Sequence, residues 1–218
     1  MSVKLPNGTL VFVASAYATL QTISAITNAT EAVATLPASH GIVVGDFVEV
    51  TSGWSGLNGR VCRIKAVSTN DVTLEGIDTS DTVRFVSGAG VGSLRKVSTF
   101  TQLTQTQQID VSGGDATFVT FSFLEDPDNE QQQIPDAKTP KSYKVTMADD
   151  ASLPWFPVLQ QLDAAKSPYA LKLVLPSGSV ICANAFVSFN DTPTLTASKV
   201  MAVVATFSAA ARQVRYAM

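Results

Sequence analysis

Charged residues are scarce in this chain, and histidine and cysteine are scarcer still. Its 218 residues include 15 Lys and Arg, 18 Asp and Glu, one His and two Cys. The net charge of −3 excludes a basic footprint for wrapping nucleic acid. His40 has no second histidine or nearby cysteine with which to hold zinc, and a hydrolase triad would depend on this one turn residue.

The sequence also contains no recognisable catalytic motif. The acidic pairs Asp126/Asp128 and Asp149/Asp150 lie in predicted loops or at a helix entry, where carboxylates favour turns and helix N-termini. We therefore predict that the chain is not an enzyme and has no catalytic, metal or cofactor site. A hydrolase that depends on His40 is the least favoured alternative.

The two cysteines, Cys62 and Cys182, lie far apart in different predicted strands. They could form a disulfide, but we interpret them as small buried thiols in a reducing compartment.

Long apolar runs are also missing. The most apolar one, Val200–Ala211, contains Thr206 and Ser208 and is shorter than the roughly 18 residues of a membrane helix. Near the N-terminus, Pro6-Asn7-Gly8 interrupts the apolar run, so we expect a turn leading into a strand rather than a signal peptide.

Valine (26 residues) and threonine (23 residues) are abundant, and both favour strands over helices. Residues 8–27 alternate loosely and predict one or two strands. Short alternating segments follow at 47–50, 60–67, 72–75 and 83–86, joined by tight turns, which is typical of a small barrel. The glycine-rich segment 88–92 is interpreted as a flexible return linker.

A second series of strands follows this linker. Ala116–Leu124 alternates apolar and polar residues, and Tyr143–Met147 resumes the pattern. Between them lies Glu125–Lys141, a polar stretch with three prolines that we expect to be mobile in an isolated subunit. Long unstructured loops in compact domains are usually functional.

One helix is predicted after these strands, with Ser152 as its cap and Pro154 in its first turn. Trp155, Leu159 and Leu162 recur at helical spacing and predict a face packed on a sheet. Strands are then expected at 170–175, 180–189 and 199–207, and residues 211–217 are expected to form a final strand or an arm.

Residues from about Val33 to Asp78 resemble a small β-barrel module that recurs in phage tail and fibre proteins and is also known from ubiquitin-activating enzymes. The resemblance rests on the following short motifs: His40-Gly41, Gly45-Asp46-x-Val48, Leu57-Asn58-Gly59, Val61 and Val72-x-Leu74-x-Gly76. This match specifies a fold and says little about binding.

The flanking segments, about 1–28 and 97–218, resemble the major tail tube protein of long, flexible-tailed bacteriophages. The strand 116–124, the long polar loop, the helix with Trp155 and Leu159, and the hairpin 171–189 carry this resemblance. Together they predict a mainly β fold: a tail-tube β-sandwich or barrel with one short flanking helix. An inserted small β-barrel domain, residues 29–96, interrupts it and faces outward.

The tail tube resemblance implies a structural subunit of the virion tail, assembled in the host cytoplasm. Hexameric rings would stack into a tube that delivers the genome, and a neutral or acidic bore would let DNA slide. It implies as partners other copies of the chain, the tape measure protein and DNA in the bore, and the tail terminator and tail tip proteins. It also implies that the long loop joins stacked rings, through the following residues: Glu125, Asp126, Asp128, Glu130, Gln131, Gln132, Gln133, Ile134 and Lys138.

A tail-tip or fibre-type protein that binds a host glycan or protein through the inserted barrel is the alternative. Its best candidate contact is Trp54 in a glycine-flanked loop, because an exposed indole can stack on a sugar. The competing interpretation is that Trp54 packs over the end of the barrel.

Overall fold

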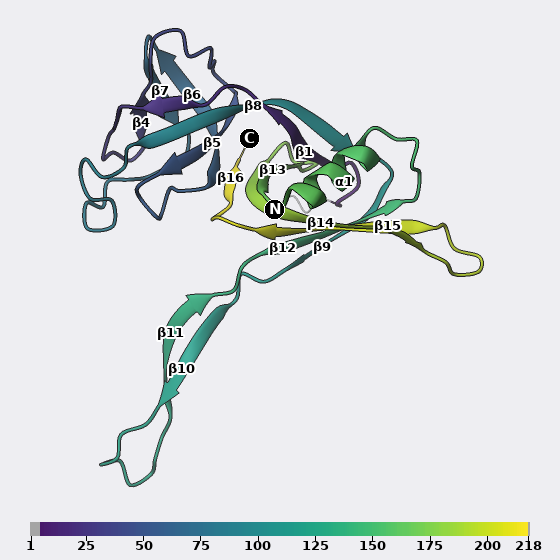
Figure 1. The fold of residues 1–218 in the computed structure, drawn as a ribbon. Helices are drawn as coiled ribbons and strands as arrows, with labels where there is room; N and C mark the ends of the chain where they lie inside the picture. The colour runs from purple at the N-terminus through teal and green to yellow at the C-terminus, as the bar shows by residue number, and fades with distance from the viewer. Residues whose placement is uncertain (1–4, 218) are drawn as a thin grey trace.

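The computed structural model describes residues 5–217, which form two β lobes and one projecting arm (Figure 1). Seventeen elements are present in the described residues, and sixteen of them are strands. The expectation of a mainly β fold with one short helix is confirmed. Among the described residues, no helix is both long and apolar enough to cross a bilayer.

The strands form one 14-stranded antiparallel sheet and one two-stranded ribbon. Hydrogen-bonded neighbours in the sheet follow the order β3-β4-β7-β6-β5-β8-β1-β13-β14-β15-β12-β9, with β2 beside β8 and β16 beside β14. The first lobe contains β2 (Gln21–Ile23), β3 (Ala25–Ile26), β4 (Val33–Thr35), β5 (Phe47–Ser52), β6 (Arg60–Ser68) and β7 (Asp71–Leu74). The second lobe contains β1 (Leu10–Tyr17), β9 (Thr106–Ser112), β12 (Ser142–Ala148), β13 (Pro168–Val174), β14 (Val180–Thr194) and β15 (Ala202–Ala209), with β16 (Val214–Tyr216) at the boundary.

The first lobe lies within the region of the predicted inserted barrel, and its apolar core continues into the second lobe through Ala14, Ala170 and Cys182. The strands predicted at 47–50, 60–67 and 72–75 are confirmed. The strand predicted at 83–86 is wrong, because this segment forms turns in which the carboxylate of Asp81 accepts the backbone N–H groups of Val83 and Arg84. A bulge between Ile64 and Ala66 also turns Ala66 outward, against the expected alternation.

The boundaries predicted at residues 28 and 97 stay a prediction. The structure adds that β2 pairs with β8 and β3 pairs with β4, so residues 21–26 already belong to the sheet of the first lobe.

The second lobe packs α1 (Trp155–Ala165) against one face of its sheet (Figure 1). Trp155, Leu159 and Leu162 are buried in its core, as their spacing predicts. The predicted cap is wrong, however. The hydroxyl and the backbone N–H of Ser152 both donate to Oδ1 of Asp150, at 2.6 and 3.0 Å, and Pro154 takes the cap position without a side-chain bond.

One long strand, β8 (Gly92–Leu103), belongs to both lobes. Its first half pairs with β5 and its second half pairs with β1. The preceding glycine segment is packed rather than free: a Cβ added at Gly90 would lie 2.5 Å from the ring of Trp54. The prediction of a flexible linker at 88–92 is therefore wrong. Gly90 has no side chain, and this allows its backbone to pack directly against the ring of Trp54.

A polar cluster joins the lobes where β8 passes between them. Arg95 donates from Nε and Nη2 to Oε2 of Glu49, at 3.0 and 2.8 Å, and Nδ2 of Asn184 on β14 donates to the other carboxylate oxygen at 3.1 Å. The guanidinium lies 3.9 Å from the ring centre of Tyr17, whose hydroxyl accepts the backbone N–H of Ala170 at 2.9 Å. Glu49 and Asn184 are buried, so these bonds are shielded from water and fix the two lobes together.

The arm consists of β10 (Ala116–Phe121) and β11 (Gln132–Lys138), which pair only with each other. It continues the pairing of β9 with β12 beyond a break at Gly113-Gly114 and Pro140, and it projects away from both lobes (Figure 1). A Cβ on Gly113 would lie 2.1 Å from the carbonyl oxygen of Pro140, so this break requires glycine.

Candidate assembly surfaces

One face of the second lobe's sheet is covered by α1, and the opposite face is polar. Its residues lie in register across β9, β12, β15 and β14. They are Gln108, Asp110, Ser112, Ser142, Lys144, Thr146, Val204, Thr206, Ser208, Phe186, Ser188 and Asn190. Its two charges, on Asp110 and Lys144, are opposite each other in the register and cancel. This polar face is therefore electrically neutral and rich in hydroxyl and amide groups.

Strand β9 is the last strand of the sheet. Its pairing with β12 satisfies one side of its backbone, and within the described residues no strand pairs with the other side. An unpaired edge of seven residues is a template for another strand. This edge can therefore accept a strand from a neighbouring molecule.

The arm carries large apolar side chains that nothing in the described chain covers. The exposed fractions of Phe118, Val119, Phe123, Leu124 and Ile134 range from 50% to 105%. Val119 and Ile134 are direct partners across the ribbon, and the rings of Phe121 and Phe123 stack edge to face at 5.4 Å. Clustered exposed apolar groups of this kind mark an interaction surface.

The predicted loop is only partly a loop. Gln132, Gln133, Ile134 and Lys138 lie in β11, so the expectation that the whole segment lacks structure is wrong for its second half.

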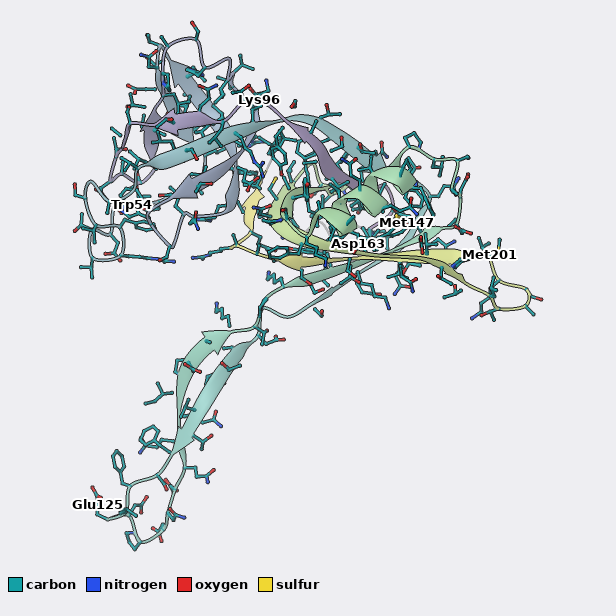
Figure 2. The ribbon with its side chains drawn as sticks, in the orientation of Figure 1. Trp54, Lys96, Glu125, Met147, Asp163 and Met201 are labelled. Carbon is teal, nitrogen blue, oxygen red and sulfur yellow. The ribbon has the colours of Figure 1, made fainter. Side chains whose placement is uncertain are left out.

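Residues 125–131 form the tip of the arm, shown by the label of Glu125 in Figure 2. Asp126 organises it, because its two carboxylate oxygens accept the backbone N–H groups of Asp128 and Glu130 at 3.1 and 3.2 Å. Gln131 is the last residue before β11. The structure thus brings all nine predicted loop residues onto one arm, and their role in joining rings stays a prediction.

Trp54 is buried, with 3% of its surface exposed, so the expectation of an exposed aromatic contact is wrong. Its indole N–H donates to the carbonyl oxygen of Val86 at 2.7 Å, and its ring meets Phe85 edge to face at 5.3 Å. The competing interpretation, in which the ring closes the end of the barrel, is the correct one. The glycines around Trp54 allow close packing rather than exposure.

His40 occupies a turn, as predicted. Its Nδ1 accepts the backbone N–H of Ile42 at 3.1 Å, and its Nε2 lies 3.1 Å from the carbonyl oxygen of Thr69. Both ring nitrogens are therefore committed to backbone groups. Within the described residues, no group of three or more His, Cys, Asp or Glu side chains is arranged to hold a metal ion.

Cys62 and Cys182 are both buried and unbridged, as predicted. Burial raises the pKa of each thiol to about 12, which disfavours the reactive thiolate.

The sequence matches the profile of the family described as "Phage tail tube protein, TTP" over residues 52–218. The chain belongs to the phage tail tube protein family. No curated protein matches the chain.

Part of the chain is similar to the following chains of solved structures. A chain from the tail of an empty gene transfer agent particle with C6 symmetry is 11% identical, with a TM-score of 0.44, 54% of this chain covered and 87% of that one. A chain from the virion of a native gene transfer agent particle is 12% identical, with a TM-score of 0.44 and coverage of 54% and 89%. A chain from the tube-terminating cap of the anti-feeding prophage is 16% identical, with a TM-score of 0.37 and coverage of 54% and 83%.

Proposed function

We propose that this tail tube protein is a self-assembling subunit whose rings, six copies each, stack into the tube of a virion tail. The observation that carries the proposal is the arm, a ribbon whose apolar side chains have no partner within the described chain. The sequence resemblance predicts that the long loop joins stacked rings. In such an assembly the apolar side chains of the arm would be buried against the next ring. Assembly in the host cytoplasm and contacts with tail terminator and tail tip proteins belong to the same proposal.

The open edge of β9 supports the contact within a ring. Edge-to-edge pairing of this strand with a neighbouring copy would satisfy its free backbone groups and close the sheet into a continuous barrel. Ring closure of this kind removes an edge that would otherwise invite aggregation.

The polar face of the β9, β12, β15 and β14 sheet is the surface that we assign to the bore. Hydroxyl and amide groups keep the bore wetted, and the absence of net positive charge gives phosphates no attractive site. DNA and the tape measure protein would therefore pass without adhering. The apolar opposite face is already covered by α1, so it is not available for this role.

Electron microscopy of the purified protein across a concentration series tests the proposal. We expect tubes or stacked rings with six copies per ring. A matched variant replaces residues 122–131 with a two-residue Asn-Gly turn, which closes β10 onto β11 without altering either lobe. It should remain folded by circular dichroism and form single rings without stacking. A wild-type protein that stays monomeric at all concentrations would overturn the proposal, and tubes from the shortened variant would overturn the role of the arm's tip.

A further inference from the structure

The root of the arm borders an open groove of about 780 Å³. The groove runs between the arm root and the segment that follows β15. Its lining residues are Gly114, Lys138, Thr139, Pro140, Lys141, Ala209, Ala210, Ala211, Arg212, Gln213 and Arg215. Four of these residues are cationic and none is anionic.

We propose that this groove binds the acidic tip of the arm from a second copy of the chain. The inference rests on the proposed function, because it names the surface that receives the arm. Neither the family match nor the solved structures assign a role to this groove.

The cations of the groove have no carboxylate partner among the described residues. The ion pairs among the described residues involve side chains outside the groove, such as Arg63 with Glu75 and Arg95 with Glu49. Lys138, Arg212 and Arg215 are exposed. Four unpaired cations around one groove repel one another, so binding an anion there lowers their electrostatic energy.

Arg60 of the first lobe does not line the groove, but it lies close enough to the lining residue Arg212 for the two charges to interact. Its Nε is buried and has no hydrogen-bond partner among the described residues. Its burial is the main cause that lowers its pKa below the usual arginine value; Cys62 and Tyr216 oppose this change, and the charges of Arg212 and Arg84 add to it. No carboxylate contributes to this shift, and an incoming carboxylate would offset it.

The walls of the groove are held in place by backbone and side-chain bonds. The backbone N–H of Ala209 donates to the carbonyl oxygen of Lys141 at 2.8 Å, and the hydroxyl of Tyr143 donates to Oε1 of Gln213. These bonds connect the segment after β15 to β12, so the groove exists before anything binds. A preformed site loses little conformational entropy when it is filled.

The arm tip has the complementary charge. Residues 116–138 contain five carboxylates and one basic residue, Lys138 at the root, which gives the arm a charge of −4 and leaves +1 on the rest of the chain. Asp126 is engaged in organising the tip, whereas Glu125, Asp128 and Glu130 accept no hydrogen bond within the described residues. Three carboxylates are therefore available for the cations of the groove.

The occupant is a second copy because the arm cannot fill its own groove. The groove lies at the root of the β10–β11 ribbon, where its lining residues Gly114 and Lys138 are. The label of Glu125 in Figure 2 marks the other end of the ribbon, distant from both lobes. A tip that binds a groove on another copy makes a head-to-tail contact, which propagates as an open stack rather than closing into a dimer.

Charge reversal on each side of the contact provides the test. The groove-reversed chain carries Arg212→Glu and Arg215→Glu. The tip-reversed chain carries Glu125→Lys, Asp128→Lys and Glu130→Lys. Lys166→Glu with Lys199→Glu is the matched control, because it changes the net charge as much as the groove reversal does at exposed sites outside the groove.

Binding between copies is measured with one chain tethered to a sensor and the other in solution. Wild-type and control copies should bind each other, and each reversed chain should bind itself at least about tenfold more weakly. The groove-reversed chain should bind the tip-reversed chain with near wild-type affinity, because both of their contacts again join opposite charges. Retained self-binding by the groove-reversed chain, no rescue in the mixed pair, or no binding between wild-type copies would each overturn the inference.

The same variants examined by electron microscopy separate this inference from the proposed function. Tubes formed equally well by wild-type and groove-reversed protein would support the tube function and refute the role of the groove in binding the arm tip. Charge-dependent binding between copies, with no tubes from wild-type protein, would support the role of the groove and refute the tube function.

Discussion

The arm and the second lobe are both built from antiparallel strands, yet they use apolar residues in opposite ways. In the lobe, Tyr143, Val145 and Met147 of β12 all point into the core. In the arm, Phe118, Val119 and Ile134 are each more than half exposed. The lobe's apolar residues stabilise the subunit, whereas those of the arm can gain stability only through another molecule.

This contrast teaches that apolar patterning alone does not place a strand in a core. A ribbon of two strands has no second layer to pack against, and such hairpins are marginally stable alone. The lobe should therefore dominate subunit stability, and the arm should dominate assembly. The following expectations test this division, from the largest effect on stability to the smallest.

Removing the largest core side chain of the second lobe should have the greatest effect. Trp155→Ala eliminates a fully buried indole that contacts Phe156 and Phe189, so the free energy of unfolding should fall by about 3–5 kcal/mol. Urea denaturation followed by circular dichroism measures it. A loss below about 1 kcal/mol would show that the lobe does not depend on this core.

The polar cluster between the lobes should come next. Glu49→Ala leaves Arg95 and Asn184 without their shared partner, and we expect a loss of about 2 kcal/mol, reduced because the Arg95 side chain is 35% exposed. Glu31→Ala is the control, since its pairing with Lys65 is more exposed and should contribute under about 1 kcal/mol. Equal losses from the two variants would mean that burial does not strengthen the inter-lobe pair.

Changes on the arm should leave the subunit's stability nearly unaltered. Phe118→Ser with Ile134→Ser removes two exposed side chains whose burial does not contribute to the isolated fold. The melting temperature should change by less than about 2 °C, whereas tube yield in sedimentation assays should collapse. A large drop in melting temperature would show that the arm belongs to the folded body.

The smallest effect concerns pH. Arg63 holds the pKa of the Glu75 carboxyl below its ordinary value of 4.5, chiefly through their side-chain hydrogen bond. The ionised carboxylate thus stabilises the fold above pH 4.5, and this contribution disappears as pH falls through the lowered pKa. The difference in unfolding free energy between wild type and Glu75→Gln should be under about 1 kcal/mol at pH 7 and vanish once the pH lies below the lowered pKa. An unchanged difference at low pH would contradict this.

Strong local patterns in the sequence were enough to predict several elements. The helical spacing of Trp155, Leu159 and Leu162 predicts α1, and the turn at 176–178 predicts the β13–β14 hairpin. The cap of α1 could not be predicted. The Ser152 hydroxyl can bond either to the first turn of the helix or to the preceding Asp150, and only the folded backbone shows that it bonds to Asp150.

The candidate site was harder to predict. Strand β11 contains glutamine, proline and aspartate, which disfavour strands, and its Pro135 is tolerated because the ribbon has free edges. The burial of Trp54 depends on Gly90, which lies 36 positions later in the chain. The groove combines the segment after β15 with the arm root, and only the fold brings these together.

The shared strand β8 has a mechanical consequence. A force applied to the first lobe passes along one continuous backbone into the outer strand of the second lobe's sheet, where β1 lies alongside. Pulling along that direction loads the β1–β8 hydrogen bonds together in shear rather than peeling them apart one at a time. A load on the first lobe would therefore be resisted by the whole β1–β8 pairing at once.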